Sequence, residues 1–300
     1  MHDIREIYRQ AANPLSKKAL AKLSRFHFLS PRKNRIRLLF FQKFIYWCFK
    51  ARNRLEIRGY EHVQREKMKG GPFIVVANHA GNMDVMMHQA IHAHHDTLVS
   101  SFINGEGFSS PQVPALSAVL YFAEAIPRRG LGQSSVDRVV KRLVAGDRVM
   151  YFPEGSFDFG LVMDGFTGIA RIAHGYWQKT GKLLRIIPSC SIGMHDAYNP
   201  HMHHHRFRHR NHRHPHPARY RLPKWAAAKR PGQKVIVNYG PAFTIDLPAT
   251  PSVQELRDAT TRIMQTIAGL WGQKRIRPNH AHNFINTRLP IVDGKRVYGG

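Results

Sequence analysis

Residues 75–84 read VVANHAGNMD, so a histidine and an aspartate follow a short apolar run. The run is typical of a buried strand, and Asn78 and His79 then fall on the turn that leaves it. If Asp84 accepts a hydrogen bond from one imidazole nitrogen of His79, the other nitrogen is free to act as a general base. No Ser or Cys nucleophile stands nearby in a recognisable elbow, so we expect the pair to activate a hydroxyl of an acceptor molecule. Alternatively, the pair only caps the next helix.

Two further segments place polar residues where predicted strands end. YFPEGSFDFG, residues 151–160, opens a loop with Glu154, Gly155 and Ser156, and AIPRRG, residues 125–130, ends in Arg128 and Arg129. Arginine forks match phosphate oxygens bidentately, so the three strand ends together would supply a base, an anion clamp and a polar loop. The structural alternatives are an ordinary capped turn and an arginine pair that only reflects a basic chain.

The elements that must position these residues alternate along the chain, which favours an α/β fold with a sheet covered by helices. Apolar runs typical of strands occur at residues 55–59, 73–78, 97–102, 123–127, 148–152, 183–192 and 234–240. Helical periodicity occurs at residues 83–94, 114–123, 134–144, 168–177 and 253–270. Ligands of α/β proteins usually bind at the carboxyl ends of strands, where all three polar segments are predicted.

Composition describes a large, strongly basic chain. With 300 residues, 43% of them hydrophobic, it can bury a sizeable core, and its formal net charge of +27 attracts polyanions. These could be nucleic acid, an anionic bilayer or an acidic carrier protein. The two cysteines, Cys48 and Cys190, support neither a disulfide framework nor a thiolate zinc site, so we expect a reducing, cytosol-facing location.

An aromatic segment, LLFFQKFIYWCFK at residues 38–50, predicts a helix that could lie in a membrane interface. Lys43, Tyr46 and Lys50 would share a narrow polar stripe on this helix. Six apolar residues would cover most of the rest: Phe40, Phe41, Phe44, Ile45, Trp47 and Phe49. Basic flanks suit anionic headgroups. The helix could equally pack on the protein's own core. We expect no signal peptide and no transmembrane helix.

A histidine- and arginine-rich stretch at about 201–222 interrupts the alternation and predicts an exposed insertion. Dense histidine can bind metal, and His88, His92 and His95 could line one helix face. A floppy tract without carboxylates or thiolates does not fix a ligand geometry, however, so we expect no metal site. A nucleic-acid-binding protein would explain the charge as well, but not the ordered motifs, and aromatic stacking platforms are not interleaved with the tract.

The blocks NHAGNMD, AIPRRG, FPEGS and RIIPSCSI, in this order, resemble those of the lysophospholipid and glycerol-phosphate acyltransferases of the PlsC type. The resemblance spans about Leu55 to Gly240. It implies a glycerol-phosphate acyltransferase-like fold, in which a mixed sheet is covered by helices and preceded by N-terminal amphipathic helices. It also implies an N-terminal membrane-interface region at 1–53, an acyltransferase domain at 54–275 that contains the insertion, and a tail at 276–300.

The resemblance further implies that His79, held by Asp84, is the general base, and that the acceptor hydroxyl attacks an acyl thioester without an acyl-enzyme. The residues it implies for acceptor or channel binding are Asn78, Arg128, Arg129, Glu154, Gly155, Ser156 and Pro188. No cofactor is expected beyond the co-substrate, acyl-CoA or acyl-carrier protein. The expected partners are a lysolipid acceptor and an anionic membrane, bound peripherally at its cytoplasmic face, and nucleic acid is not expected.

Two departures bear on the acceptor. Phe157 stands where the family commonly has arginine, which removes one expected phosphate partner, and Arg128 follows Pro127 without the usual spacing. Lysophosphatidate is the first expectation, and another lysolipid or a lipid with a non-phosphate headgroup is the alternative. An inactive family member serving as a membrane or carrier-protein adaptor is a further alternative.

Overall fold

The computed structural model describes residues 35–81, 83–104, 123–126, 133–155, 161–194, 197, 232–278, 291–292 and 295–296. The chain divides into two compact units, each assembled from three segments. The first unit takes its residues from 1–55, 82–129 and 193–235, and the second from 56–81, 130–192 and 236–300. The predicted boundaries after residues 53 and 275 stay predictions.

The second unit is built on a mixed sheet. Its central strand β2 (Ile74–Ala77) pairs in parallel with β5 (Val149–Tyr151) on one side and with β6 (Ile186–Ile192) on the other. The strand β7 (Lys234–Tyr239) runs antiparallel to β6, and β1 (Arg54–Arg58) lies beside β7. The mixed α/β sheet predicted from the sequence is confirmed.

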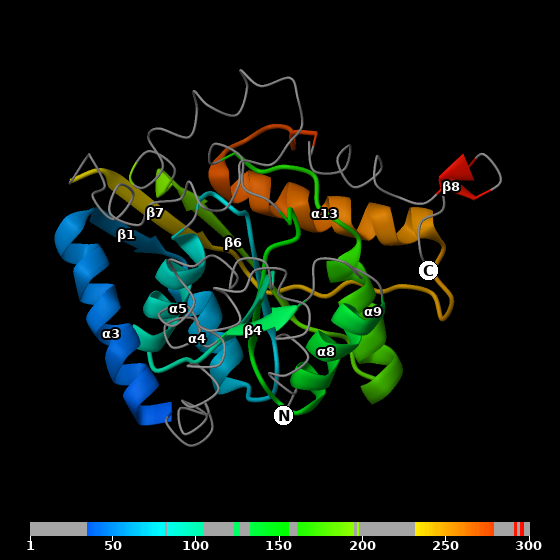
Figure 1. Ribbon diagram of the computed structural model, residues 1–300, viewed down its shortest axis with the longest axis horizontal. Coiled ribbons are helices and arrows are strands. Elements are labelled where there is room, and N and C mark those ends of the chain that lie inside the picture. Colours follow the sequence, from blue (N-terminus) through cyan, green and yellow to red (C-terminus); the bar gives the residue numbers. More distant parts are fainter. Residues whose placement is uncertain are drawn as a thin grey trace, which may run out of the picture. The chain divides into compact units, whose positions relative to one another are not determined.

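Helices cover this sheet because its strands are apolar on both faces. Every residue of β2 is fully buried, as expected for a parallel strand with layers on both sides. The helix α9 (Gly168–Thr180) packs against α8 (Gln133–Val144) and against α13 (Val253–Trp271), and α13 lies along β6 (Figure 1). The second unit also contains the short hairpin of β8 (Ile291–Val292) and β9 (Lys295–Arg296).

The helix α13 has sequence signals at both ends. The Ser252 hydroxyl accepts a hydrogen bond from the Glu255 amide, and the Glu255 carboxylate accepts one from the Ser252 amide, forming a capping box. Gly272 ends the helix in the left-handed conformation, with φ of 81°, which glycine adopts without a steric penalty. The predicted helix at 253–270 is therefore confirmed nearly to the residue.

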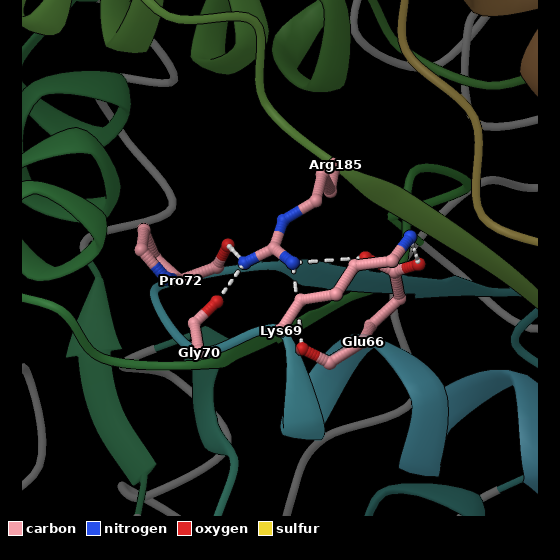
Figure 2. Close-up of polar contacts among 5 residues, drawn as sticks. All are labelled: Glu66, Lys69, Gly70, Pro72 and Arg185. Atoms are coloured by element: carbon pink, nitrogen blue, oxygen red, sulfur yellow. Dashed lines mark hydrogen bonds and ion pairs between the residues drawn. The ribbon is translucent and has the colours of Figure 1, made fainter.

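The helix α4 (Tyr60–Met68) lies before β2 and was not predicted from the sequence. It is mostly polar, with only Tyr60, Val63 and Glu66 buried, so its apolar periodicity is weak. Glu66 forms salt bridges with Lys69 at 2.6 Å and with Arg185 at 2.9 Å (Figure 2). Since Arg185 directly precedes β6, this network ties α4 to the sheet.

The first unit contains a helix pair and a strand pair. The helix α3 (Arg35–Arg52) packs along α5 (Asp84–His94) (Figure 1). The strands β3 (Ser100–Asn104) and β4 (Ala123–Ile126) pair in parallel. Both strands were predicted within a few residues of their observed bounds.

The aromatic helix α3 has both buried and exposed aromatic residues. Tyr46 and Phe49 are 6% and 5% exposed and belong to the core, whereas Phe44 and Trp47 are 58% and 54% exposed. Tyr46 stacks on the ring of His94, with 3.9 Å between centroids. The placement of Tyr46 on a polar stripe was therefore wrong, because this stacking draws the ring inward. Phe40 and Phe41 lie outside the described side chains.

Within the residues that the structure describes, every helix is too short or too polar to cross a bilayer.

Candidate active site

The main chain at the carboxyl end of β2 is held by Asn78. The β2–β6 ladder ends at the pair of Ala77 and Ser189. Beyond it, the fully buried Asn78 side chain takes over. Its Oδ1 accepts a hydrogen bond from the Ser191 amide at 2.8 Å, and its Nδ2 donates to the Ser191 carbonyl at 3.2 Å. The side-chain amide of Asn78 thus makes the pair of hydrogen bonds that a further strand residue would make. The chain therefore stays attached to β6 where β2 leaves the sheet.

His79 follows on this turn with its ring half-buried. Its backbone N–H donates to Oε2 of Glu154 at 2.6 Å, a short distance typical of a charge-assisted bond. The imidazole packs against the ring of Phe152 in a tilted arrangement, with 5.0 Å between the ring centroids and 38° between the ring planes. Both the main chain and the ring of His79 are therefore fixed by residues of the FPEG segment.

The FPEG segment is a tight turn at the end of β5. The Gly155 amide donates to the Phe152 carbonyl at 3.4 Å, which closes the four residues into a turn. Proline at the second position and glycine at the fourth are favoured in such turns. Gly155 has a φ of 61°, and a side chain there would press on the Phe166 ring. The sequence FPEG is thus explained by a turn that points Glu154 inward.

Glu154 is fully buried and bridges two segments. Besides the bond from His79, its Oε1 accepts a hydrogen bond from the Met163 amide at 2.7 Å. The segment around Met163 is itself fixed, because the main chains of residues 162 and 164 exchange hydrogen bonds with Arg277. Burial, with a further contribution from the charge of Glu154, raises the pKa of the nearby Cys190 thiol well above its usual value.

Asp84 is the first residue of α5, in the first unit. Its carboxylate is fully buried and accepts a hydrogen bond from the Val85 amide at 2.9 Å, whereas the N-cap residue of this helix is Met83, without a side-chain cap. One turn later lies His88, also fully buried. Burial lowers the pKa of His88 to about 4, although the charge of Asp84 acts in the opposite direction. His88 is therefore neutral at neutral pH.

The second unit brings together Asn78, His79, Glu154 and Gly155 at the ends of β2 and β5. Pro188 lies inside β6, buried, where its carbonyl accepts the Gly240 amide at 2.9 Å. Because His79 and Asp84 belong to different units, their pairing stays a prediction. Four residues that bear on the acceptor lie outside the described residues: Arg128, Arg129, Ser156 and Phe157. The insertion at about 201–222 lies outside them as well.

Sequence reasoning missed the partners of these residues. Ser191 and Phe152 stand inside blocks that were recognised, but nothing in the sequence indicates that Ser191 pairs with the Asn78 amide. The Met163 amide offers no side-chain signal at all. Such main-chain partners become visible only when the strands are assembled.

Comparisons with known proteins give one family match and a similar solved structure. The model of the family described as Acyltransferase matches residues 54–189, which include β2, His79 and the FPEG turn. The match covers 136 of the 300 residues, and at the level of this family the prediction of an O-acyltransferase is confirmed. Among solved structures, the chain is similar to the 1-acyl-sn-glycerophosphate (LPA) acyltransferase PlsC from Thermotoga maritima, with a TM-score of 0.48 and 14% identity over 90% of this chain and 88% of that chain. A comparison with curated proteins gave no match.

Proposed function

We propose that this acyltransferase moves a fatty acyl group from an acyl thioester to the hydroxyl of a lysophospholipid such as lysophosphatidate. The observation that carries the proposal is the position of His79. It stands at the carboxyl end of a central parallel strand, inside the matched region, with its main chain fixed and its ring half-buried. A base needs this combination of fixed geometry and access to the substrate.

In the proposed reaction His79 acts as the general base, with Asp84 orienting its ring. A ring nitrogen takes the proton of the acceptor hydroxyl while the oxygen attacks the thioester carbonyl. The carbon–sulfur bond then breaks, the ester remains on the acceptor, and the proton on His79 passes to the departing thiolate. Acyl-CoA and acyl carrier protein both supply this leaving group, and no metal or redox cofactor takes part.

We propose that the enzyme acts at a membrane surface, because lysolipids reside there. Phe44 and Trp47 lie three residues apart, and hence on one side of α3, and both are more than half exposed. Lys50 stands over the Trp47 ring at 5.1 Å from its centroid. An aromatic pair with an adjacent cation fits the boundary between acyl chains and anionic headgroups.

The test is turnover of a radiolabelled acyl thioester against a panel of lysolipids, with and without a phosphate headgroup. We expect an ester product with the wild-type chain and a loss of at least about 100-fold with His79→Ala, the usual contribution of a general base. The control is the unfolding temperature, which should change little because the His79 ring is half-buried. Folded wild-type protein without turnover on any lysolipid would refute the proposal.

The same assay separates the two donors. Acyl-CoA and the acyl carrier protein thioester are compared at low and high salt. A carrier docked by the basic surface predicts a carrier KM that rises steeply with salt, since exposed charges are screened. Turnover with acyl-CoA but not with the carrier thioester would indicate that the positive charge of the protein serves membrane binding and not carrier docking.

A further inference from the structure

The acid of the FPEG block has a geometry that does not suit binding of an acceptor. Glu154 is fully buried, so a lipid headgroup cannot reach its carboxylate from the surface. Each of its oxygens accepts a backbone N–H, one from His79 at 2.6 Å and one from Met163 at 2.7 Å. These two bonds join the strand exit that carries His79 to a segment anchored on Arg277.

A second attachment acts on the residue just before His79. The Asn78 amide makes two hydrogen bonds with the main chain of Ser191, at 2.8 and 3.2 Å, and is fully buried as well. The chain is therefore held at two successive residues, to β6 through Asn78 and to the FPEG turn through Glu154. The imidazole follows these two attachments and lies against the Phe152 ring.

We propose that Glu154 and Asn78 are positioning residues that fix the main chain of His79, and that neither contacts the acceptor. The inference rests on the proposed role of His79 as the base, and it changes the role expected for both residues. Displacement of a catalytic group by about 1 Å can cost roughly 100-fold in rate. A buried carboxylate is well suited to prevent this, because its charge-assisted hydrogen bonds are about twice as strong as neutral ones.

The decisive variant is Glu154→Gln. Glutamine keeps the size of the side chain, but its Nε2 donates, so one of the two backbone N–H groups loses its acceptor and faces another donor. The matched control is Glu66→Gln. Glu66 is also a buried glutamate of the second unit, but it pairs with Arg185 before β6, at the opposite end of that strand. A general loss of stability would appear in both variants.

The first readout does not depend on turnover. Labelling with ¹⁵N-histidine gives amide signals from only 20 histidines, and His79→Gln identifies the signal of His79. We expect Glu154→Gln to shift the His79 amide signal and to speed its hydrogen exchange, whereas Glu66→Gln leaves both unchanged. An unmoved His79 signal in folded Glu154→Gln protein would overturn the inference, and so would an equal shift in Glu66→Gln.

The second readout is the split between kcat and KM. A positioning role predicts that Glu154→Gln lowers kcat by roughly 10- to 100-fold while the acceptor KM stays near its wild-type value. A raised acceptor KM with unchanged kcat would overturn the inference and restore the acceptor-binding role. If the wild-type chain shows no turnover, the proposed function fails, and the amide signal alone still decides whether Glu154 holds His79.

Asn78→Asp provides a second variant if Glu154→Gln does not fold. Aspartate still accepts from the Ser191 amide, but its other oxygen then faces the Ser191 carbonyl, so the attachment to β6 is half lost. We expect the same signature, a shifted His79 amide and a lowered kcat. An unchanged amide and unchanged kinetics in folded Asn78→Asp protein would contradict the positioning role.

Discussion

Arg185 Nη1 lies 2.9 Å from Glu66 Oε2, and the same guanidinium donates through Nη2 to the carbonyls of Gly70 and Pro72 (Figure 2). One side chain thus joins the end of α4, the loop before β2 and the start of β6. The Glu66 carboxylate is only 5% exposed, so its charge depends on this partner and on Lys69. Buried charges are tolerated only when they are paired.

We predict that Arg185→Met lowers the free energy of unfolding by about 3 kcal/mol, since removal of one partner of a buried pair typically costs 3 to 5 kcal/mol and Arg185 itself is partly exposed. Chemical denaturation followed by circular dichroism measures this. Lys69→Met, on the more exposed partner, should cost clearly less. Equal costs would show that Arg185 is not the main partner.

The same network should respond to acid. Burial alone raises the pKa of Glu66, but hydrogen bonds and charges from Lys69 and Arg185 outweigh it and leave the pKa below its usual value. A carboxyl group whose pKa is lower in the folded state stabilises above its unfolded pKa, about 4.3, and that contribution is lost as pH falls through the folded value. Glu66→Gln should therefore reduce the loss of stability below about pH 4.3. An unaltered profile would contradict this assignment.

A second acid-sensitive group acts in a higher pH window. His88 has a pKa of about 4 in the fold, against about 6.5 when unfolded, so acidification between these values protonates the unfolded chain first. We predict a loss of roughly 3 kcal/mol across this window, at about 1.4 kcal/mol per pKa unit. His88→Gln should flatten the dependence whatever its effect on absolute stability. An unchanged slope in folded His88→Gln protein would contradict this assignment.

These networks also mark what could be predicted from the sequence. The strands β2, β5, β6 and β7 and the helices α8, α9 and α13 were predicted within a few residues, because apolar periodicity and capping residues are local signals. The helix α4, with the sequence YEHVQREKM, was not predicted, because its buried face includes Glu66. The partner of Glu66, Arg185, lies 119 residues away in the sequence. A buried charge with a distant partner looks like an exposed one in a linear sequence.

The candidate site divides in the same way. Asn78, His79, Glu154 and Gly155 were identified by residue type at strand ends, and the structure gathers them. Their roles were less predictable, because the partners of Asn78 and Glu154 are backbone groups of Ser191, His79 and Met163. An acid beside a predicted base suggests contact with substrate, and only burial and hydrogen-bond geometry indicate otherwise.

The two sides of α3 allow membrane binding to be separated from stability. The double variant of Phe44→Ser and Trp47→Ser removes exposed aromatic area, so we predict loss of the salt-resistant fraction that sediments with anionic vesicles, with little change in unfolding temperature. Phe49→Ser, in the core, should instead cost about 3 kcal/mol of stability, as for truncation of a buried phenylalanine. Folded wild-type protein that stays in the supernatant at low salt would contradict membrane binding.

The last prediction concerns the acceptor headgroup. If Arg128 and Arg129 clamp a phosphate, replacing both with Ala should raise the acceptor KM far more than the thioester KM, because a bidentate arginine contact is lost on one substrate only. Phe157→Arg restores the residue common in the family and should improve the use of phosphate-bearing acceptors over neutral ones. The panel of lysolipids with and without phosphate measures both effects as ratios of kcat/KM. Equal changes in both KM values would assign the arginines a general electrostatic role, and an unchanged preference in Phe157→Arg would place that position outside the acceptor pocket.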